Sequence, residues 1–212
     1  MTMTVKIDIV SDHVCPWCYI GKRRLEQALA QRPEVTAQIS WLPFQLSPDM
    51  PPEGKDRREH YESIFGADRA REIIEGMRVT GASEGLDFET RPGARSPNTM
   101  AAHRLMYWAA QLDHADQTEL AEKLFVAHHV DCEDIGNPDV LARLAGEVDM
   151  DPAVVRDKLQ TDADEEEVRA MMERARQMGV TGVPFFIVNE RYAFSGAQPP
   201  EAIVELLDRL TR

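Results

Sequence analysis

Cysteine is scarce in this chain, and so are long apolar runs and basic residues. Only three of the 212 residues are cysteine. The first ten residues lack the basic start, the long apolar stretch and the small-residue cleavage site of a signal peptide. No run approaches the roughly 18 apolar residues that cross a membrane. We therefore expect a protein of the reducing cytoplasm, where a close cysteine pair is more often catalytic or redox-sensing than structural.

Basic residues are outnumbered by acidic ones. Lysine and arginine number 24, aspartate and glutamate number 37, and the formal net charge is −13. This balance disfavours general binding to nucleic acid or to an anionic membrane surface. The apolar fraction of 43% is ordinary for a globular core. The length suits one large domain or a domain with a sizeable insertion.

The chain does contain a Cys-Pro-Trp-Cys motif at residues 15–18. It follows an apolar segment, Val5–Val10, that predicts a strand, and it opens a helical pattern that runs to Gln31. A helix N-terminus offers unpaired backbone N–H groups and a partial positive charge, which both favour a thiolate on Cys15. Pro16 suits the first turn, where its missing N–H would be unpaired anyway. Because the thiolate is the attacking species in disulfide exchange, this placement indicates dithiol chemistry.

The cysteine pair has two other interpretations. One is half of a zinc site, which needs further ligands at matching spacing. Cys132 has no such companion, and the adjacent His128 and His129 do not stand at a known ligand spacing. The other is a pair of buried structural cysteines, against which the intervening Pro-Trp and the immediate helix start argue. We expect no bound metal.

The coarse pattern along the chain is strand–helix–strand, then helices, then strand–strand–helix. Alternating apolar residues predict a second strand at Val35–Phe44. From about residue 57 to 178 the chain reads as a run of helices. The closing elements are predicted at Val183–Val188, Tyr192–Phe194 and Pro199–Leu210.

This order predicts a discontinuous organisation. Residues 1–60 and 179–212 are expected to form one sheet domain. Residues 61–178 are then a helical insertion and not an independent neighbour. No internal repeat or low-complexity linker separates the parts.

The order of elements, with Cys-Pro-Trp-Cys opening the first helix, is similar to the thioredoxin fold. The large helical insertion resembles the DsbA family, and the closer likeness is to its FrnE-like cytoplasmic branch. The resemblance implies an α/β thioredoxin fold with an all-helical insertion between the second and third strands. The stretches that carry it are 11–21 (SDHVCPWCYIG), 43–51 (PFQLSPDMP), 98–105 (NTMAAHRL), 179–186 (GVTGVPFF) and 195–198 (SGAQ).

The resemblance also implies roles for individual residues. Cys15 is expected to be the attacking cysteine and Cys18 the resolving one, and their order on the helix, with Cys18 one turn in, predicts that Cys15 is the more exposed and Cys18 the more buried. In thioredoxin-like proteins the proline that opens the third strand is cis and packs against the dithiol, which here implies Pro184. An ordinary strand-edge proline is the alternative. With a cis Pro184, the backbone of Val183 is free to pair with an extended substrate segment.

The chain departs from the family pattern at two positions. Exported DsbA enzymes have a histidine between the cysteines, whereas this chain has Trp17 after Pro16. An imidazolium would stabilise a neighbouring thiolate and indole carries no charge, so we expect a less strongly lowered pKa for Cys15 and a weaker oxidant. Cys132 stands where relatives usually look glycine-like. We interpret it as incidental, with a regulatory thiol as the next interpretation.

Four further residues are candidates for substrate binding. His13 flanks the motif and could assist proton movement, although a solvent-facing loop histidine is the simpler interpretation. Asn98 could hold a small thiol or act as a helix cap. Ser195 and Gly196 could also hold a small thiol, or they could form only a β-turn.

Three functions remain under comparison. The leading hypothesis is a thiol–disulfide oxidoreductase that acts on protein or small-molecule disulfides and needs no cofactor beyond its own dithiol. The second is a glutathione-dependent isomerase or transferase. The 2-hydroxychromene-2-carboxylate isomerases and kappa-class glutathione transferases look like this scaffold but generally carry serine where Cys15 stands. The third is a redox-switched binding protein. The expected partners are thiol- or disulfide-bearing proteins or glutathione, and a homodimer is an open option.

Overall fold

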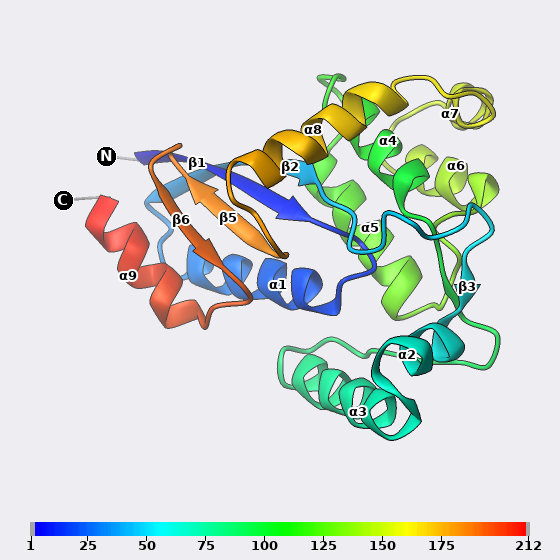
Figure 1. Cartoon of the computed structure of the whole chain (residues 1–212). Coiled ribbons are helices and arrows are strands. Elements are labelled where there is room, and N and C mark those ends of the chain that lie inside the picture. Colours follow the sequence, from blue (N-terminus) through cyan, green and yellow to red (C-terminus); the bar gives the residue numbers. More distant parts are fainter. Residues whose placement is uncertain (1–2, 211–212) are drawn as a thin grey trace.

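A four-stranded mixed sheet organises the computed structural model, which describes residues 3–210 (Figure 1). The spatial order of the strands is β2-β1-β5-β6. β1 pairs in parallel with β2 and antiparallel with β5, and β5 pairs antiparallel with β6. These strands span Met3–Ser11 (β1), Val35–Pro43 (β2), Phe185–Val188 (β5) and Tyr192–Ser195 (β6).

The helices follow the predicted order, and the thioredoxin fold with a helical insertion is confirmed. The segment between β2 and β5 also contains two short antiparallel strands, β3 (Lys55–Asp56) and β4 (Arg95–Ser96), and β3 lies before residue 61, in the part assigned to the sheet domain. The all-helical interpretation of residues 57–178 missed β4, because two residues carry no measurable alternation. The helices span Pro16–Ala30 (α1), Arg57–Phe65 (α2), Ala67–Ser83 (α3), Met100–Ala109 (α4), Gln117–His129 (α5), Pro138–Gly146 (α6), Pro152–Leu159 (α7), Glu165–Gln177 (α8) and Pro200–Leu210 (α9).

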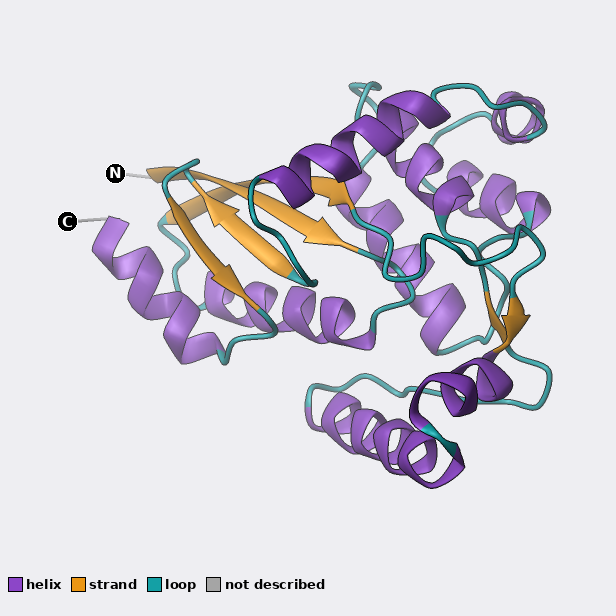
Figure 2. Cartoon of the chain, viewed as in Figure 1, coloured by secondary structure: helices purple, strands orange, loops and turns teal. Residues whose placement is uncertain are grey.

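One face of the sheet is covered by α1 and α9 (Figures 1 and 2). Val5, Ile7 and Ile9 alternate along β1, so their side chains share this face. They are at most 1% exposed and belong to the same apolar cluster as Leu25 of α1 and Leu207 of α9. Burial of these side chains fixes the register of the central strand.

The opposite face is crossed by α8, drawn in gold above the sheet in Figure 1. Val10 is one residue out of phase with the first set and lies in a separate cluster with Phe44 and Ala175. Val180, just after α8, completes this cluster. The sheet is therefore buried on both sides around the end of β1, where the motif begins.

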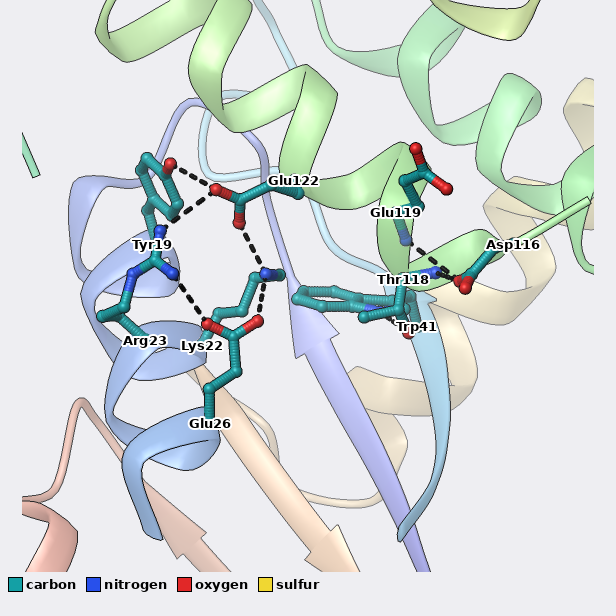
Figure 3. A network of polar contacts seen from close by, with 9 residues as sticks. All are labelled: Tyr19, Lys22, Arg23, Glu26, Trp41, Asp116, Thr118, Glu119 and Glu122. Carbon is teal, nitrogen blue, oxygen red and sulfur yellow. Dashed lines mark hydrogen bonds and ion pairs between the residues drawn. The ribbon is translucent and has the colours of Figure 1, made fainter. Parts of the chain in front are cut away.

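Polar side chains cap the helices of the insertion. Asp116 accepts hydrogen bonds from the backbone N–H groups of Thr118 (2.8 Å) and Glu119 (3.0 Å) at the start of α5 (Figure 3). Asn137 caps α6 in the same way, as the sequence predicted, by accepting from the N–H of Asp139. Such caps contribute about 1 kcal/mol each because they pair otherwise unsatisfied donors.

An ionic network around Glu122 joins α5 to α1 (Figure 3). The Tyr19 hydroxyl donates to Glu122 Oε1 at 2.7 Å, and the Lys22 ammonium donates to Glu122 Oε2 at 2.5 Å. Arg23 Nη2 lies 3.1 Å from Oε1. Burial opposes ionisation of Glu122, but Lys22, Tyr19 and Arg23 outweigh it and hold the pKa of this carboxyl below its usual value. The network fixes the insertion against the helix that carries the motif.

Candidate functional site

The dithiol lies at the start of α1, which follows β1, with Cys15 just before the helix and Cys18 in its first turn. Cys15 is the N-cap residue of α1, with extended backbone angles (φ −87°, ψ 112°), and Pro16 is the first helical residue. The backbone N–H of Cys15 donates to the carbonyl of Asp12 at 3.0 Å, and that of Cys18 donates to the carbonyl of Cys15 at 3.0 Å. The predicted helix start is confirmed, and it places Cys15 at the positive end of the helix dipole.

Both cysteines are free thiols, and Cys18 is the more deeply buried. Cys15 is 4% exposed and Cys18 is 0% exposed, in the expected order. The two residues lie 3.6 Å apart. Burial raises the pKa of Cys18 well above its usual value, and the adjacent Cys15 raises it further. The Ser11 hydroxyl and the backbone at Asp12 oppose that rise only in part.

The Val183–Pro184 peptide bond lies beside Cys15 and is cis, as expected. Cys15 Sγ lies 3.7 Å from the Val183 carbonyl oxygen, to which it donates. The turn after β6 supports this loop, because the N–H of Gly196 donates to the Pro184 carbonyl at 2.8 Å. Gly196 has a positive φ of 76°, which glycine adopts without strain, and Ser195 next to it is exposed. Ser195 and Gly196 thus form the turn that holds the proline loop.

A cavity of about 310 Å³ opens beside Cys15, and we call it the front cavity. The motif, the 46–50 loop and the α2–α3 hairpin form its walls. Three large apolar side chains line it while remaining 43–47% exposed: Trp17, Leu46 and Phe65. No lysine or arginine is among the described residues that line it. Most of the residues that line the front cavity are therefore apolar, although the buried Asp12 also lines it.

Tyr61 and His60 of α2 also line the front cavity, and no sequence motif indicated them. Burial raises the pKa of Tyr61, and so does the facing Cys15, while Arg57 opposes both. The Nδ1 of His60 is buried without a hydrogen bond to any described residue. These residues follow Cys15 by more than forty positions and belong to no motif, so only the folded insertion brings them to the dithiol.

His13 does not face solvent, and the simpler interpretation of this residue was wrong. Its side chain is buried, with the residue 2% exposed, and its ring centroid lies 5.3 Å from those of His103 and Phe125. Burial lowers the pKa of His13 well below its usual value, and His103 and His129 lower it further. The reason is that α4 and α5 of the insertion cover the motif, which the local sequence does not reveal. His13 is not among the described residues that line the front cavity.

Asn98 joins two segments of chain and does not line the front cavity within the described residues. Its side-chain amide donates to the Met50 carbonyl at 2.6 Å. Its oxygen accepts from the Gln45 side chain at 3.1 Å and from the N–H of Met100 at 3.0 Å. Asn98 therefore combines the predicted cap-like contact with a connection from α4 to the 45–50 loop.

Cys132 lies apart from the motif, after α5. Its thiol donates to the Glu89 carbonyl at 3.4 Å, and its φ is 59°, in the region that glycine favours. Among residues 3–210, no group of three or more histidine, cysteine or acidic residues is arranged to hold a metal ion. The described helices likewise include none long and apolar enough to cross a membrane.

Comparisons with known proteins agree with this geometry. The family model described as the DsbA-like thioredoxin domain matches residues 6–208. The crystal structure of a probable DsbA oxidoreductase from Streptomyces coelicolor, SCO1869, superposes with a TM-score of 0.86 at 30% identity. That match covers 97% of this chain and 89% of the other.

Two more distant structures share the fold. A 2-hydroxychromene-2-carboxylate isomerase superposes with a TM-score of 0.69 at 14% identity, covering 98% of this chain and 96% of the other. The cytosolic disulfide reductase DsbM of Pseudomonas aeruginosa superposes with a TM-score of 0.66 at 17% identity, covering 97% and 99%. A second structure of DsbM contains glutathione.

Proposed function

Because this chain belongs to the family of DsbA-like thioredoxin domains, we propose that it catalyses thiol–disulfide exchange, with Cys15 as the nucleophile and Cys18 as the resolving cysteine. One observation carries the proposal. Cys15 caps a helix N-terminus at the edge of an open cavity, 3.6 Å from Cys18 and beside the Val183–Pro184 loop. A thiolate at this position has a helix dipole to stabilise it, a partner within bonding reach and room for a substrate.

In the reducing direction, the Cys15 thiolate attacks one sulfur of a substrate disulfide. A mixed disulfide forms and the first substrate thiolate leaves. Cys18, as its thiolate, then attacks Cys15 Sγ and expels the second substrate thiolate. The substrate has gained two electrons, and the enzyme holds a Cys15–Cys18 disulfide that a thiol such as glutathione must reduce. The oxidising direction is the reverse of these steps.

The walls of the site favour apolar disulfide-bearing segments. The exposed faces of Trp17, Leu46 and Phe65 border the front cavity and can bury apolar substrate surface. The Val183 backbone lies beside Cys15 and can pair with an extended chain. Glutathione is the proposed small thiol partner, since the structurally similar DsbM has been seen with it. Cytoplasmic location, membership of the FrnE-like branch and a homodimer stay predictions.

A glutathione-dependent isomerase is the second candidate. The shared fold with 2-hydroxychromene-2-carboxylate isomerase supports it. The presence of both cysteines within reach of each other counts against it, because isomerisation needs no resolving thiol. Glutathione-dependent turnover of a chromene carboxylate by a Cys18→Ser protein, without disulfide reduction by the wild type, would reverse the order of the two candidates.

Alkylation and trapping test the assignment of roles. In the reduced protein, a thiol reagent is expected to label Cys15 first, because Cys18 is buried and its pKa is raised. Cys15→Ser should abolish disulfide reduction. Cys18→Ser should lose turnover and accumulate a mixed disulfide on Cys15, visible by mass spectrometry. Cys132→Ser is the matched control and should retain activity. Preferential labelling of Cys18 would contradict the assignment.

A further inference from the structure

His128, in the last turn of α5, lines the front cavity together with Cys15. The residue is 3% exposed, and its ring is held by Arg57, the first residue of α2. Arg57 Nη2 donates to His128 Nδ1 at 3.1 Å and to the His128 carbonyl oxygen at 2.9 Å. Arg57 Nε donates to the Arg95 carbonyl oxygen at 3.3 Å. These contacts fix the guanidinium, and the imidazole with it, where α2 meets α5.

The contact with Arg57 determines which nitrogen of His128 carries the proton. An arginine side chain has only donors and stays protonated in proteins, so His128 Nδ1 accepts and carries no proton. Burial lowers the pKa of His128 well below its usual value, and the ring is therefore neutral near pH 7. Arg57, His129 and His13 lower that pKa further. Because a neutral imidazole has one N–H group, that group in His128 is Nε2–H.

This Nε2–H group has no hydrogen-bond partner among the described residues. It is not among the described side-chain atoms that are sealed in the core without a partner, and His128 lines the front cavity. The positive charge of Arg57 behind the ring polarises the imidazole and strengthens the donor. The front cavity is therefore bordered by a strong, oriented N–H donor whose partner must come from inside the cavity.

The walls of the front cavity indicate which kind of acceptor suits this donor. No lysine or arginine is among the described residues that line it, Arg57 included, although the acidic Asp12 is. A carboxylate placed there would lose its hydration without meeting a positive group on the walls. A peptide carbonyl carries no net charge and is satisfied by one N–H donor. Trp17 and Phe65 offer apolar surface to the rest of such a segment.

We infer that His128, oriented by Arg57, donates a hydrogen bond from Nε2 to a backbone carbonyl of the disulfide-bearing segment, and that this contact favours peptide disulfides as substrates. The inference deepens the proposed function and rests on it. His128 is then a substrate-binding residue, and Arg57 is a positioning residue that acts through it. His128 keeps its proton throughout, so the exchange balances as described above.

Two other rings of the front cavity, Tyr61 and His60, lack this arrangement. Tyr61 faces Cys15, so an effect of its hydroxyl falls on the attacking sulfur whatever the substrate. His60 Nδ1 is buried without a hydrogen bond to any described residue, so no contact there fixes its tautomer. Only His128 combines a fixed tautomer with an N–H donor at the cavity.

The tautomer is measured on the unmodified protein by ¹⁵N NMR of the imidazole rings, with the His128 signals assigned by their loss in His128→Gln. At pH 7, a pyridine-like Nδ1 and a pyrrole-like Nε2 are expected. Arg57→Met removes the donor to Nδ1 and should give a mixture of both tautomers, a change that a merely structural role of Arg57 would not produce. A pyrrole-like Nδ1 in the wild type would overturn the inference.

Two neutral disulfides test the contact with substrate. The disulfide of N-acetylcysteine methylamide carries peptide carbonyls, whereas diethyl disulfide has no acceptor besides sulfur. The second-order rate constant for oxidation of the reduced protein by each is measured by acid quenching and mass spectrometry. His128→Phe is expected to lower the ratio of the peptide to the diethyl rate constant about three- to tenfold. His128→Gln should retain at least about half of the wild-type ratio, because an amide can accept from Arg57 and still donate to the cavity.

Tyr61→Phe is the matched control, and it should change both rate constants by the same factor. If neither disulfide oxidises the reduced wild type, the proposed function fails. If both oxidise it and His128→Phe leaves the ratio unchanged, only the inference fails, so the two failures are distinguishable. Circular dichroism of each variant identifies any loss of fold, and the NMR measurement on the wild type does not depend on it.

Discussion

Of the two residues between the cysteines, Trp17 is the one from which we expect the larger effect on the redox potential. Its indole is 43% exposed and carries no charge. The helix N-terminus is therefore the main local source of stabilisation for a Cys15 thiolate, on the order of 0.3–2 kcal/mol. Because about 1.4 kcal/mol corresponds to 30 mV for a two-electron couple, this source alone does not produce a very oxidising protein. We expect a potential between those of thioredoxin and exported DsbA.

Trp17→His should make the protein more oxidising. A protonated imidazole in the first turn of α1 stabilises the thiolate, and with it the reduced form, so the potential should rise by roughly 10–30 mV. The rise should be larger at pH 6 than at pH 8, because an exposed histidine titrates near pH 6.5. Equilibration with glutathione buffers measures it. Trp17→Phe is the matched control, and a more reducing histidine variant would show that another group controls Cys15.

At the scale of elements, the close approach of α1 to the start of β5 positions the dithiol against the proline loop. Gly21 lies at the contact point. A Cβ at this residue would lie 3.1 Å from Pro184 Cγ and 3.2 Å from Phe186 Cζ. Phe186 is fully buried and stacks on Phe194 with ring centroids 4.6 Å apart, so it has little freedom to move. A side chain larger than hydrogen at residue 21 therefore pushes the helix away from Pro184.

Gly21→Ala should lower the stability by about 1 kcal/mol and slow disulfide exchange. The overpacking outweighs the gain in helix propensity, which is at most about 1 kcal/mol. Gly76→Ala in α3 is the matched control. No atom lies within 4 Å of a Cβ there, so that variant should gain up to about 1 kcal/mol without a change in rate. Urea unfolding and insulin reduction measure both properties. Equal stabilisation by the two substitutions would contradict the close contact.

At the scale of the whole molecule, buried neutral histidines couple the fold to pH. His13, His128 and His129 come from the motif and from α5, and burial lowers the pKa of each. The positive Arg57 lowers the pKa of the latter two further, and that of His129 falls to about 3. Arg57 Nη2 donates to His128 Nδ1 at 3.1 Å, and His129 Nε2 donates to the His13 carbonyl at 3.1 Å. The first contact needs an unprotonated Nδ1 on His128, whereas the second favours protonation of His129 and is outweighed by burial and by Arg57.

The free energy of unfolding should therefore fall as the pH drops below about 6.5. In the unfolded chain these histidines bind protons near pH 6.5, whereas in the folded chain they stay neutral, so acid favours unfolding. Each contributes up to about 1.4 kcal/mol per pH unit below that value. Urea unfolding at pH 7.5 and 5.5 should show a loss of roughly 2–4 kcal/mol.

Single substitutions separate the contributions of the individual histidines to the pH dependence of the stability. In His129→Gln, about one proton fewer should be taken up on unfolding, so the free energy of unfolding should depend less steeply on pH. This holds whatever the effect of the substitution on the stability at pH 7.5. His114→Gln, at an exposed loop position, should leave the dependence unchanged. A stability that stays flat between pH 7.5 and 5.5 would show that the buried histidines are protonated in the folded protein.

Much of the fold could be predicted because its signals are local. The alternation in Val5–Val10 and the apolar stripe in the closing helix depend only on neighbouring residues. The N-cap Asn137 and the first-turn Pro138 of α6 are likewise local signals, because they depend only on neighbouring residues. The two-residue strands β3 and β4 were missed because pairing across about forty residues, not local pattern, makes them strands.

By itself, the sequence determined the dithiol, its place at a helix N-terminus and the thioredoxin arrangement around it. The first two follow from the spacing of the cysteines, the first-turn proline and the periodicity of the flanking segments, and the thioredoxin arrangement was implied by the resemblance to the DsbA family. Only the tertiary structure decided what surrounds the dithiol. It buried His13 under α4 and α5, brought Tyr61 to the front cavity and set His103 beside Asp12. These contacts join residues more than forty positions apart, and packing of the insertion against the sheet domain creates them.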